Sequence, residues 1–347
     1  MYTKEKLSET LKNMALELGA SKVGIATNDS LKGGPESTRL KDALKGAKSA
    51  IIFAVPLNQD LINPYLSKED FSLNEDKIRK TTFAGGISLE IAGFLDQMDY
   101  GAIPIAPNFV YRKDTPNGIR DRKPIISHKY LAARAGVGFF GHSGHILTKD
   151  NGSAIVLSSV VTNAELIATD PIKKSDNYCD GCKLCKAVCI PDYISDEKTK
   201  VNIGGFDFEY QNPKSHWRCI LVCGGATGLH PSRKYSTWSP GRFEIPKKDK
   251  DFEKLREKAM PSYVKRTLKD PSFYHPGVPN HKMQYTCSTC QLVCNPDKKV
   301  RKERYLLFKN SGVIIEDEMG NRKKVSPDYA NSFIENIEND RKKLYID

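Results

Sequence analysis

The sequence predicts an α+β protein in which an α/β domain precedes a cysteine-rich module. Three observations lead to this prediction. The N-terminal half, to about residue 165, alternates helix-like and strand-like hydrophobic patterns and contains no cysteine. All nine cysteines then fall between residues 179 and 294, in three tight groups. At 347 residues, the chain is long enough for a substantial core and for one or two domains.

The elements of the first domain follow from hydrophobic spacing. Four apolar residues recur at helical spacing near the N-terminus and precede Gly19, which favours a helix end there: Leu7, Leu11, Met14 and Leu18. Further along, the patterns predict strands at 22–26, 50–55 and 102–106 and helices at 75–97 and 131–135. A sheet with helices packed on it is the expected outcome.

Glycines indicate a possible helix break and a hairpin turn in this domain. Gly85-Gly86 could divide the helix expected at 75–97 into two. Asn151-Gly152 is a typical hairpin turn, so we expect 146–147 and 154–161 to pair across it.

The spacing of the cysteines predicts two iron-sulfur clusters. Residues 179–189 have C-x2-C-x2-C-x3-C spacing and residues 287–294 have C-x2-C-x3-C spacing, a combination in which one cysteine of each run reaches across to the other cluster. We assign one cluster to Cys179, Cys182, Cys185 and Cys294, and the other to Cys189, Cys219, Cys287 and Cys290. This assignment makes residues 170–300 a ferredoxin-like module and leaves Cys223 over.

Zinc ribbons and disulfides are the alternative explanations of the cysteines. CxxC pairs also form tetrahedral zinc sites, although a four-cysteine run with this spacing is less typical of zinc. Disulfides are disfavoured because the N-terminus, MYTKEKLSETLKNMA, does not resemble an export signal. We therefore expect the reducing cytoplasm, where thiols remain available for metal.

Between the second and third cysteine groups lies a polar, Gly/Pro/Lys-rich insertion at 224–282. We expect an ordered loop over a site, because long ordered loops in compact domains are often lids or binding segments. A disordered spacer is the alternative. Its aromatic residues argue against that alternative: Tyr235, Trp238, Phe243, Tyr263, Phe273 and Tyr274.

Charge and hydropathy bound the partners. The net charge of +12 suggests an anionic partner, such as nucleic acid, an acidic electron-donor protein or a phosphate-bearing cofactor. No apolar run approaches the ~18 to 20 residues that span a bilayer, so no membrane partner is expected. The basic stretches 112–129 and 298–304 could contact phosphate or RNA, or be solvated faces.

Several motifs together carry a resemblance to a known family. In chain order they are DRKPIISHKYLAARAGVGFFGHSGHIL at 121–147, CDGCKLCKAVC, the cysteine of WRC, and CSTCQLVC. This order resembles epoxyqueuosine reductases and the related reductive dehalogenases over roughly residues 100 to 300.

The resemblance implies a cobalamin-dependent reductase with two [4Fe-4S] clusters, fed by a low-potential electron donor such as ferredoxin or flavodoxin. It implies a nitroreductase-like α/β domain at 1–168, a double-cluster domain at 169–300 that contains the insertion, and an extension at 301–347. The cobalamin would be base-off, and the chain indeed lacks an Asp-x-His-x-x-Gly motif.

The resemblance also implies roles for single residues. Asp121 occupies the position of the family's proton-donating aspartate, a role that needs burial to raise its pKa. The alternative is a solvated loop aspartate, because Arg120, Arg122 and Lys123 favour its charged form. A loop that approaches cobalamin closely would comprise Gly136, Gly138, Gly141, His142 and Ser143, although a helix C-cap followed by a tight turn explains these glycines as well.

Three functions follow from these observations. The first is a cytoplasmic reductase that removes oxygen or halide from a small organic substrate or a modified nucleoside. The second is an iron-sulfur electron carrier without cobalamin. The third is a tRNA-modifying epoxyqueuosine reductase proper, against which we weigh the 53 residues after Cys294, too few for the family's tRNA-holding helical repeats.

Overall fold

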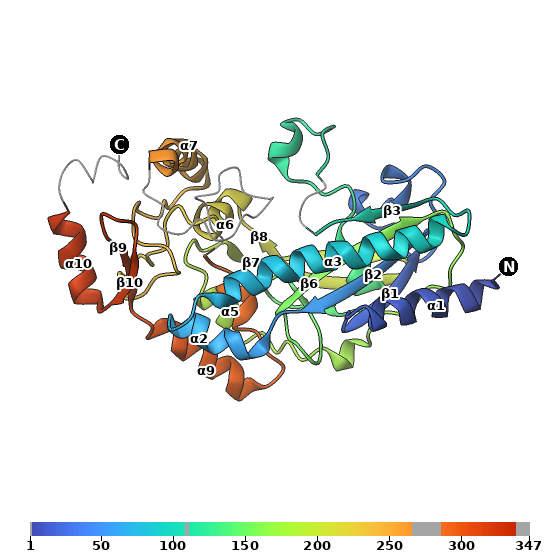
Figure 1. Cartoon of the computed structure of the whole chain (residues 1–347), viewed down its shortest axis with the longest axis horizontal. Coiled ribbons are helices and arrows are strands. Elements are labelled where there is room, and N and C mark those ends of the chain that lie inside the picture. Colours follow the sequence, from blue (N-terminus) through green and yellow to red (C-terminus); the bar gives the residue numbers. More distant parts are fainter. Residues whose placement is uncertain (1, 108–110, 266–285, 338–347) are drawn as a thin grey trace. The chain divides into compact units, whose positions relative to one another are not determined.

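The computed structural model describes residues 2–107, 111–265 and 286–337 (Figure 1). The chain forms two compact units that interleave along the sequence. The first comprises Met1–Gln59, Asp76–Gly181 and Lys198–Tyr210, and the second comprises Asp60–Glu75, Cys182–Glu197 and Gln211–Asp347. One of the boundaries between the units, at 181/182, lies inside the first cysteine group. Segment 60–75 joins the second unit because its helix α2 (Ile62–Ser67) packs against α9 (Lys298–Lys309).

The first unit is built on a four-stranded antiparallel sheet. Its order is β1-β2-β6-β3, so β6 has a neighbour on each edge. The strands are β1 (Lys22–Thr27), β2 (Ser49–Pro56), β3 (Ala102–Ile105) and β6 (Ile155–Thr162), which confirms the four strands expected from the sequence.

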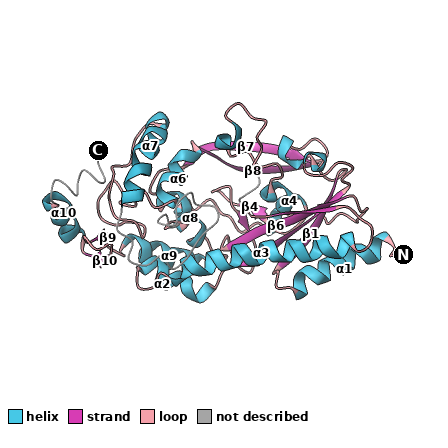
Figure 2. Ribbon diagram, turned by 45° about the horizontal axis from the view of Figure 1, so that its top comes forward, coloured by secondary structure: helices cyan, strands magenta, loops and turns pink. Residues whose placement is uncertain are grey.

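Helices cover both faces of this sheet. Because successive strand residues point to opposite faces, Ile51 and Phe53 pack with α1 (Lys4–Glu17) and α3 (Ser72–Asp96), whereas Ala50 and Ile52 pack with α4 (His128–Arg134). Figure 2 shows α1 and α3 along one side of the sheet and α4 on the other. Each fully buried Ile or Phe contributes about 1.5 to 3 kcal/mol to this packing.

Helix α1 begins and ends where its sequence predicts. The Thr3 hydroxyl accepts a hydrogen bond from the Lys6 amide at 3.2 Å, an N-cap that satisfies one of the otherwise unpaired amides. Leu7, Leu11 and Ala15 form its buried face. The chain leaves the helix through Gly19, whose φ of +104° suits a residue without a Cβ.

Helix α3 runs unbroken through Gly85-Gly86, so the possible break is not present. Two helical glycines cost about 1 kcal/mol each relative to alanine. The residues on either side offset this cost, because Ala84, Ile87 and Ile91 are all buried in the core under the sheet.

The hairpin expected across Asn151-Gly152 is wrong. Residues Ile146–Leu147 form β5 and pair with β4 (Phe139–Phe140), not with β6. The physical reason is that β2 and β3 already occupy both edges of β6. The turn itself exists, since the Thr148 amide donates to the Gly152 carbonyl at 2.9 Å and Gly152 has a φ of +61°.

A second hairpin lies where we expected only the cysteine module. Strands β7 (Ile194–Ile203) and β8 (Phe206–Pro213) pair around Gly204-Gly205, whose φ angles are +59° and +82°. Both glycines therefore adopt the left-handed conformation that tight hairpin turns require.

The second unit consists of short helices and one small hairpin. Its other helices are α5 (Leu184–Ala187), α6 (His216–Cys223), α7 (Asp249–Lys265), α8 (Thr289–Leu292) and α10 (Pro327–Asn336). Strands β9 (Val313–Glu316) and β10 (Arg322–Val325) pair antiparallel. Short 3-10 turns complete the chain's described elements, at Glu36–Thr38, Leu40–Asp42, Gln59–Leu61, Gly118–Asp121 and Lys174–Asp176.

The insertion expected as a loop at 224–282 contains a helix. Phe252 of α7 is fully buried and packs with Trp217 and Leu221 of α6, so this part of the insertion is not a spacer. Tyr235 is also buried. Two of the aromatics behind the expectation, Phe273 and Tyr274, lie outside the described residues.

Among the described residues, no helix combines the length and the apolar character that crossing a membrane requires.

Candidate functional site

The two C-x2-C-x3-C runs of the second unit adopt the same local conformation. In each, the residue after the first cysteine is left-handed, with φ of 58° at Lys183 and 91° at Ser288. A single helical turn follows at once, α5 in the first run and α8 in the second, and it carries the middle cysteine. The repeated turn brings three cysteines together within a short stretch of each run, as a cluster-binding loop requires; of these thiols Cys185 and Cys287 are buried and Cys182 is exposed.

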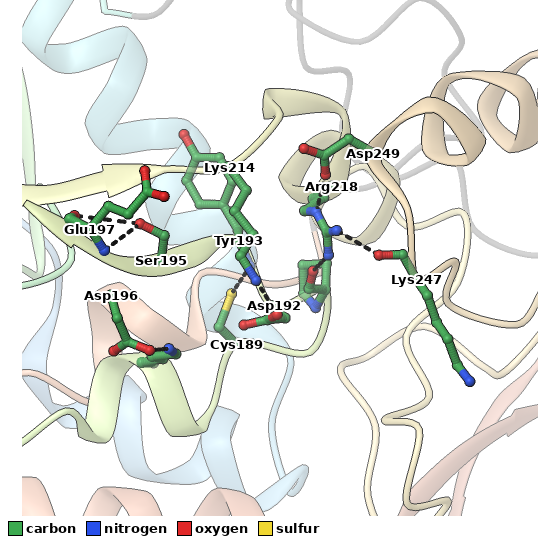
Figure 3. Close-up of polar contacts among 12 residues, drawn as sticks. Cys189, Asp192, Tyr193, Ser195, Asp196, Glu197, Lys214, Arg218, Lys247 and Asp249 are labelled. Atoms are coloured by element: carbon green, nitrogen blue, oxygen red, sulfur yellow. Dashed lines mark hydrogen bonds and ion pairs between the residues drawn. The ribbon is translucent and has the colours of Figure 1, made fainter.

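Hydrogen bonds join the two runs. The Thr289 hydroxyl donates to the Val188 carbonyl at 3.2 Å, and helix α5 packs against α8. Behind the first run, the Tyr193 amide donates to the Cys189 sulfur at 3.2 Å (Figure 3). Amide donors to a cysteine sulfur stabilise its anionic form, which is the form that binds metal.

Helix α6 brings two further cysteines to the same place. The buried Arg218 guanidinium donates to the Pro191 carbonyl at 3.0 Å and to the Lys247 carbonyl at 2.8 Å, and it pairs with Asp249 (Figure 3). These contacts fix α6 beside the first cysteine run. At the other end of α6, the Thr286 amide donates to the Cys223 carbonyl at 3.0 Å, which ties the helix to the third cysteine group.

The thiols of this group raise one another's pKa values. Burial raises the pKa of Cys189 to about 11, and the nearby Cys287 sulfur adds to that rise. Burial and then neighbouring cysteines raise the pKa values of Cys287 and Cys290, whereas the Cys223 side chain and then burial raise the pKa of Cys219. Thiolates collected this closely repel each other, so a cationic iron centre that binds them fits this donor set.

Two arginines of α9 contact the cysteine runs. Arg301 and Arg304 are both buried. The Arg301 Nη1 donates to the Cys182 sulfur at 3.5 Å, and Arg304 Nη1 donates to the Leu292 carbonyl at 3.1 Å between Cys290 and Cys294. Sequence reasoning placed both in a basic run of undecided role. A positive charge held beside a metal cluster favours its more negative, reduced state.

Aromatic residues from outside the cysteine runs also enclose this group. Tyr65 is buried, and its hydroxyl donates to the Cys287 carbonyl at 3.2 Å. Its backbone carbonyl in turn accepts from the Trp238 ring nitrogen at 2.9 Å. Neither residue has a sequence signal that relates it to the cysteines, because both contacts arise only from folding.

Cys179 belongs to the first unit and has its own supports there. Its amide donates to the Asn177 side-chain oxygen at 2.9 Å, and the Asn177 amide group donates to the Phe140 carbonyl at 3.3 Å. Its sulfur accepts a hydrogen bond from the backbone amide of His142 at 3.3 Å. The loop expected to approach cobalamin therefore contacts a predicted cluster ligand.

The three glycines of that loop face the protein's own chain. A Cβ at Gly136 would lie 2.3 Å from the Asp170 carbonyl oxygen, and at Gly138 2.6 Å from that of Leu147. A Cβ at Gly141 would lie 2.7 Å from the Leu147 side chain. Internal packing therefore accounts for glycine at these three positions, and their expected contact with cobalamin stays a prediction.

The two histidines of this region, His142 and His145, are half-buried. Burial lowers the pKa of His145 to about 3, with nearby Lys129 as a lesser cause, so it is neutral. His142 and Ser143 are half-buried on the turn that follows Gly141.

Asp121 lies in a loop closed at its base by the Tyr111–Pro124 bridge. Its carboxylate accepts from the Asn117 side chain at 2.9 Å and from the Asn117 amide at 3.1 Å. These bonds, the side-chain one first, hold its pKa below the usual value. In this arrangement Asp121 is a carboxylate at neutral pH. A proton donor needs the opposite, a pKa raised by burial. The basic Arg112 of the same loop is paired with Asp42, Asp114 and Glu36.

Across the described residues, no three His, Cys, Asp or Glu side chains converge as a site for a single metal ion.

Comparison with known proteins points to one enzyme family. No protein-family model matches the chain. The epoxyqueuosine reductase of Gloeobacter violaceus is 25% identical, over 52% of this chain and 58% of that protein. The epoxyqueuosine reductase of Atelocyanobacterium thalassa is 38% identical over 18% of this chain and 20% of that protein. The chain spans between 20 and 64% of the length of the curated relatives it matches.

Solved structures similar to this chain include a reductive dehalogenase and epoxyqueuosine reductases. A reductive dehalogenase, whose structure is described as suggesting a mechanism for B12-dependent dehalogenation, is 17% identical with a TM-score of 0.49, over 64% of this chain and 30% of that one. The epoxyqueuosine reductase from Streptococcus thermophilus is 19% identical with a TM-score of 0.38, over 57% and 55% of the two chains. An epoxyqueuosine reductase solved with an epoxyqueuosine-modified tRNA-Tyr stem loop is 19% identical with a TM-score of 0.34, over 54% and 52%. The names of the curated relatives confirm the resemblance expected from the motifs, and the described helices and strands confirm a mixed α+β fold class.

Proposed function

We propose that this protein is an iron-sulfur oxidoreductase, similar to epoxyqueuosine reductase, that removes oxygen or halide reductively from an organic substrate. The observation that supports the proposal most directly is the pair of C-x2-C-x3-C runs with matching turns, joined by the Thr289–Val188 hydrogen bond. The names of the relatives support the reaction class.

The cysteines would hold two [4Fe-4S] clusters in the arrangement assigned from the sequence: Cys179, Cys182, Cys185 and Cys294 for one, and Cys189, Cys219, Cys287 and Cys290 for the other. Such clusters, when bound, accept and release single electrons at low potential. The protein's contribution is to keep water from the sulfurs and to offset their negative charge. Burial of Cys185 and Cys287, and the cations of Arg301 and Arg304, provide these two effects.

Cobalamin, base-off, is the second cofactor of the proposal. When bound, it supplies a strongly reducing cobalt centre suited to attack on an epoxide or a carbon–halogen bond. Its support is the family resemblance and the absence of an Asp-x-His-x-x-Gly motif from the sequence. The proposed contacts are those that the resemblance implies: Gly136, Gly138, Gly141, His142 and Ser143.

Reductive removal also needs protons, and Asp121 is the proposed donor. Removing an epoxide oxygen as water consumes two electrons and two protons, whereas replacing halide by hydrogen consumes two electrons and one proton. Asp121 would act only after its bonds to Asn117 are released, since those bonds favour the charged carboxylate.

The proposed substrate is a small organic molecule or a modified nucleoside, and the proposed electron donor is an acidic ferredoxin or flavodoxin in the cytoplasm. The net charge of +12 favours such a donor. A tRNA substrate is the second candidate, because the curated relatives are epoxyqueuosine reductases and a similar solved structure is an epoxyqueuosine reductase with a modified tRNA stem loop. Salt-sensitive tRNA binding with turnover would distinguish it from charge-driven binding alone.

Cobalt retention tests the cofactor and turnover tests the reaction. Reconstituted protein is incubated anaerobically with cobalamin, desalted, and assayed for cobalt and for reduction of epoxide and halide substrates with a chemical electron donor. About one retained cobalt per chain and product formation support the proposal. Full iron content without cobalt or turnover would instead identify an electron carrier.

A further inference from the structure

The thiol group of the second unit contains one cysteine more than its cluster requires. A [4Fe-4S] cluster binds four thiolates. Cys189, Cys287 and Cys290 provide three of the second cluster's ligands, and α6 carries both Cys219 and Cys223. The choice between these two cysteines is therefore made by the geometry of α6.

Both α6 thiols lie on one face of the helix. Residues four apart are neighbours on a helix surface, about 5 to 6 Å between their Cβ atoms. The neighbouring Cys223 side chain is the largest cause that raises the pKa of the Cys219 thiol, followed by burial. The opposite face of α6 is buried against α7 through Trp217 and Leu221, so the helix presents its cysteine face away from that core.

The Cys219 and Cys223 thiols have different tyrosine neighbours but share their cysteine neighbours. Burial raises the pKa of the half-buried Tyr193 hydroxyl, four residues after Cys189, and the Cys219 thiol adds to that rise. Burial raises the pKa of the Tyr65 hydroxyl, and the Cys287 and Cys223 thiols add to that rise. Both α6 thiols interact electrostatically with the Cys287 and Cys290 thiols.

Hydrogen bonds hold the chain in place at both Cys223 and Cys219. The Thr286 amide donates to the Cys223 carbonyl at 3.0 Å, and the Thr286 hydroxyl bonds the Ser239 hydroxyl at 2.8 Å. Thr286 directly precedes Cys287, so this bond fixes the last turn of α6 beside that ligand. Cys219 is fixed through its neighbour Arg218, which donates to the Pro191 carbonyl at 3.0 Å.

We propose that Cys219 and Cys223 are interchangeable ligands of the second cluster, with one bound and the other in reserve. This inference rests on the proposed iron-sulfur function. In the exchange, one iron–sulfur bond to Cys219 breaks and one to Cys223 forms. The proton of the incoming Cys223 thiol passes to the leaving Cys219 sulfur, and no electron is gained or lost.

The test is the iron content of four proteins reconstituted anaerobically: wild type, Cys219→Ala, Cys223→Ala and the double variant. Alanine is chosen because a serine oxygen could itself bind iron, and because it favours the helix. The inference predicts about eight irons in wild type and in each single variant, and about four in the double variant. Cys287→Ala, which removes a ligand without a reserve, should retain about four irons.

Loss of a cluster from either single variant would overturn the inference and identify the residue lost as the sole α6 ligand. A wild-type protein without iron would overturn the proposed function itself, which separates the two failures. If a single variant does not accumulate, alkylation of the loaded wild-type protein decides the question. Label divided between Cys219 and Cys223 supports exchange, whereas label on one alone, or on neither, contradicts it.

Discussion

The backbone amide of His142 donates a hydrogen bond to the sulfur of Cys179 across 3.3 Å. His142 is the second residue of a turn in which the Gly144 amide donates to the Gly141 carbonyl at 2.9 Å. The amide at this position takes no part in closing such a turn, so it is available to the cysteine. A loop predicted as a cofactor contact thereby supports a predicted cluster ligand.

If Cys179 binds a cluster as proposed, removing that single donor should lower the reduction potential of that cluster. His142→Pro deletes the amide hydrogen at a position where proline suits the turn, because the φ of His142 is not left-handed. His142→Ala keeps the hydrogen and is the matched control. Potentials come from a redox titration followed by electron paramagnetic resonance. Equal potentials in the two variants would show that the hydrogen bond has no effect on the cluster.

Arg301 should raise the potential of the same cluster through its charge. Arg301→Gln removes a buried cation bonded to the Cys182 sulfur, so the reduced cluster loses stabilisation and its potential becomes more negative. Lys302→Gln, at an exposed position on the same helix, removes the same charge and should leave the potential nearly unchanged. A shift of equal size in both variants would assign the effect to net charge.

Asp121→Asn should lower turnover by about 100-fold or more, in line with the loss of a general acid, with iron content unchanged. Asn117→Ala removes one of the bonds that depress the Asp121 pKa, so that pKa rises towards its ordinary value. The acid then stays protonated to higher pH, and the pH above which activity declines moves upward. Unchanged turnover in the Asn variant would mean that the proton comes from another group.

Hydrophobic periodicity predicted the first unit well because its strands and helices are long enough to show it. All four sheet strands and the helices α1, α3 and α4 lie where their patterns placed them. The pairing of 146–147 was wrong because an Asn-Gly turn reports local geometry, whereas strand partners depend on which sheet edges are open. The hairpin at Gly204-Gly205 did carry a signal, since paired glycines between alternating residues are typical of tight turns.

For the candidate site, cysteine spacing predicted which residues gather, but not what surrounds them. Arg301 and Tyr65 are brought to the thiols by packing between segments far apart in sequence, and no local pattern records such contacts. The glycines after α4 show the converse. Their spacing suited a cofactor contact and a helix end equally, and the structure uses them for close packing of the chain.

Replacing Lys68 should stabilise the protein and remove part of its pH dependence. This lysine is 5% exposed, bonded to Ser311, and burial lowers its pKa from 10.5 to about 7. Between these two pH values the unfolded chain binds a proton that the folded one does not, so stability rises with pH there. Lys68→Met should add about 1 to 4 kcal/mol below pH 7, and the advantage should shrink as pH rises.

Urea unfolding at several pH values measures this effect. Lys323→Met, at an exposed lysine, is the control and should change stability by less than about 0.5 kcal/mol at every pH. A Lys68→Met variant whose stability follows pH as the wild type does would show that Lys68 is not the group responsible.

Eight of the nine cysteines are proposed to hold two iron-sulfur clusters, and the iron and acid-labile sulfide content of the anaerobically reconstituted protein tests this most directly. The account predicts about eight of each per chain. One or two zinc ions with no sulfide, or iron that is lost on desalting, would contradict it.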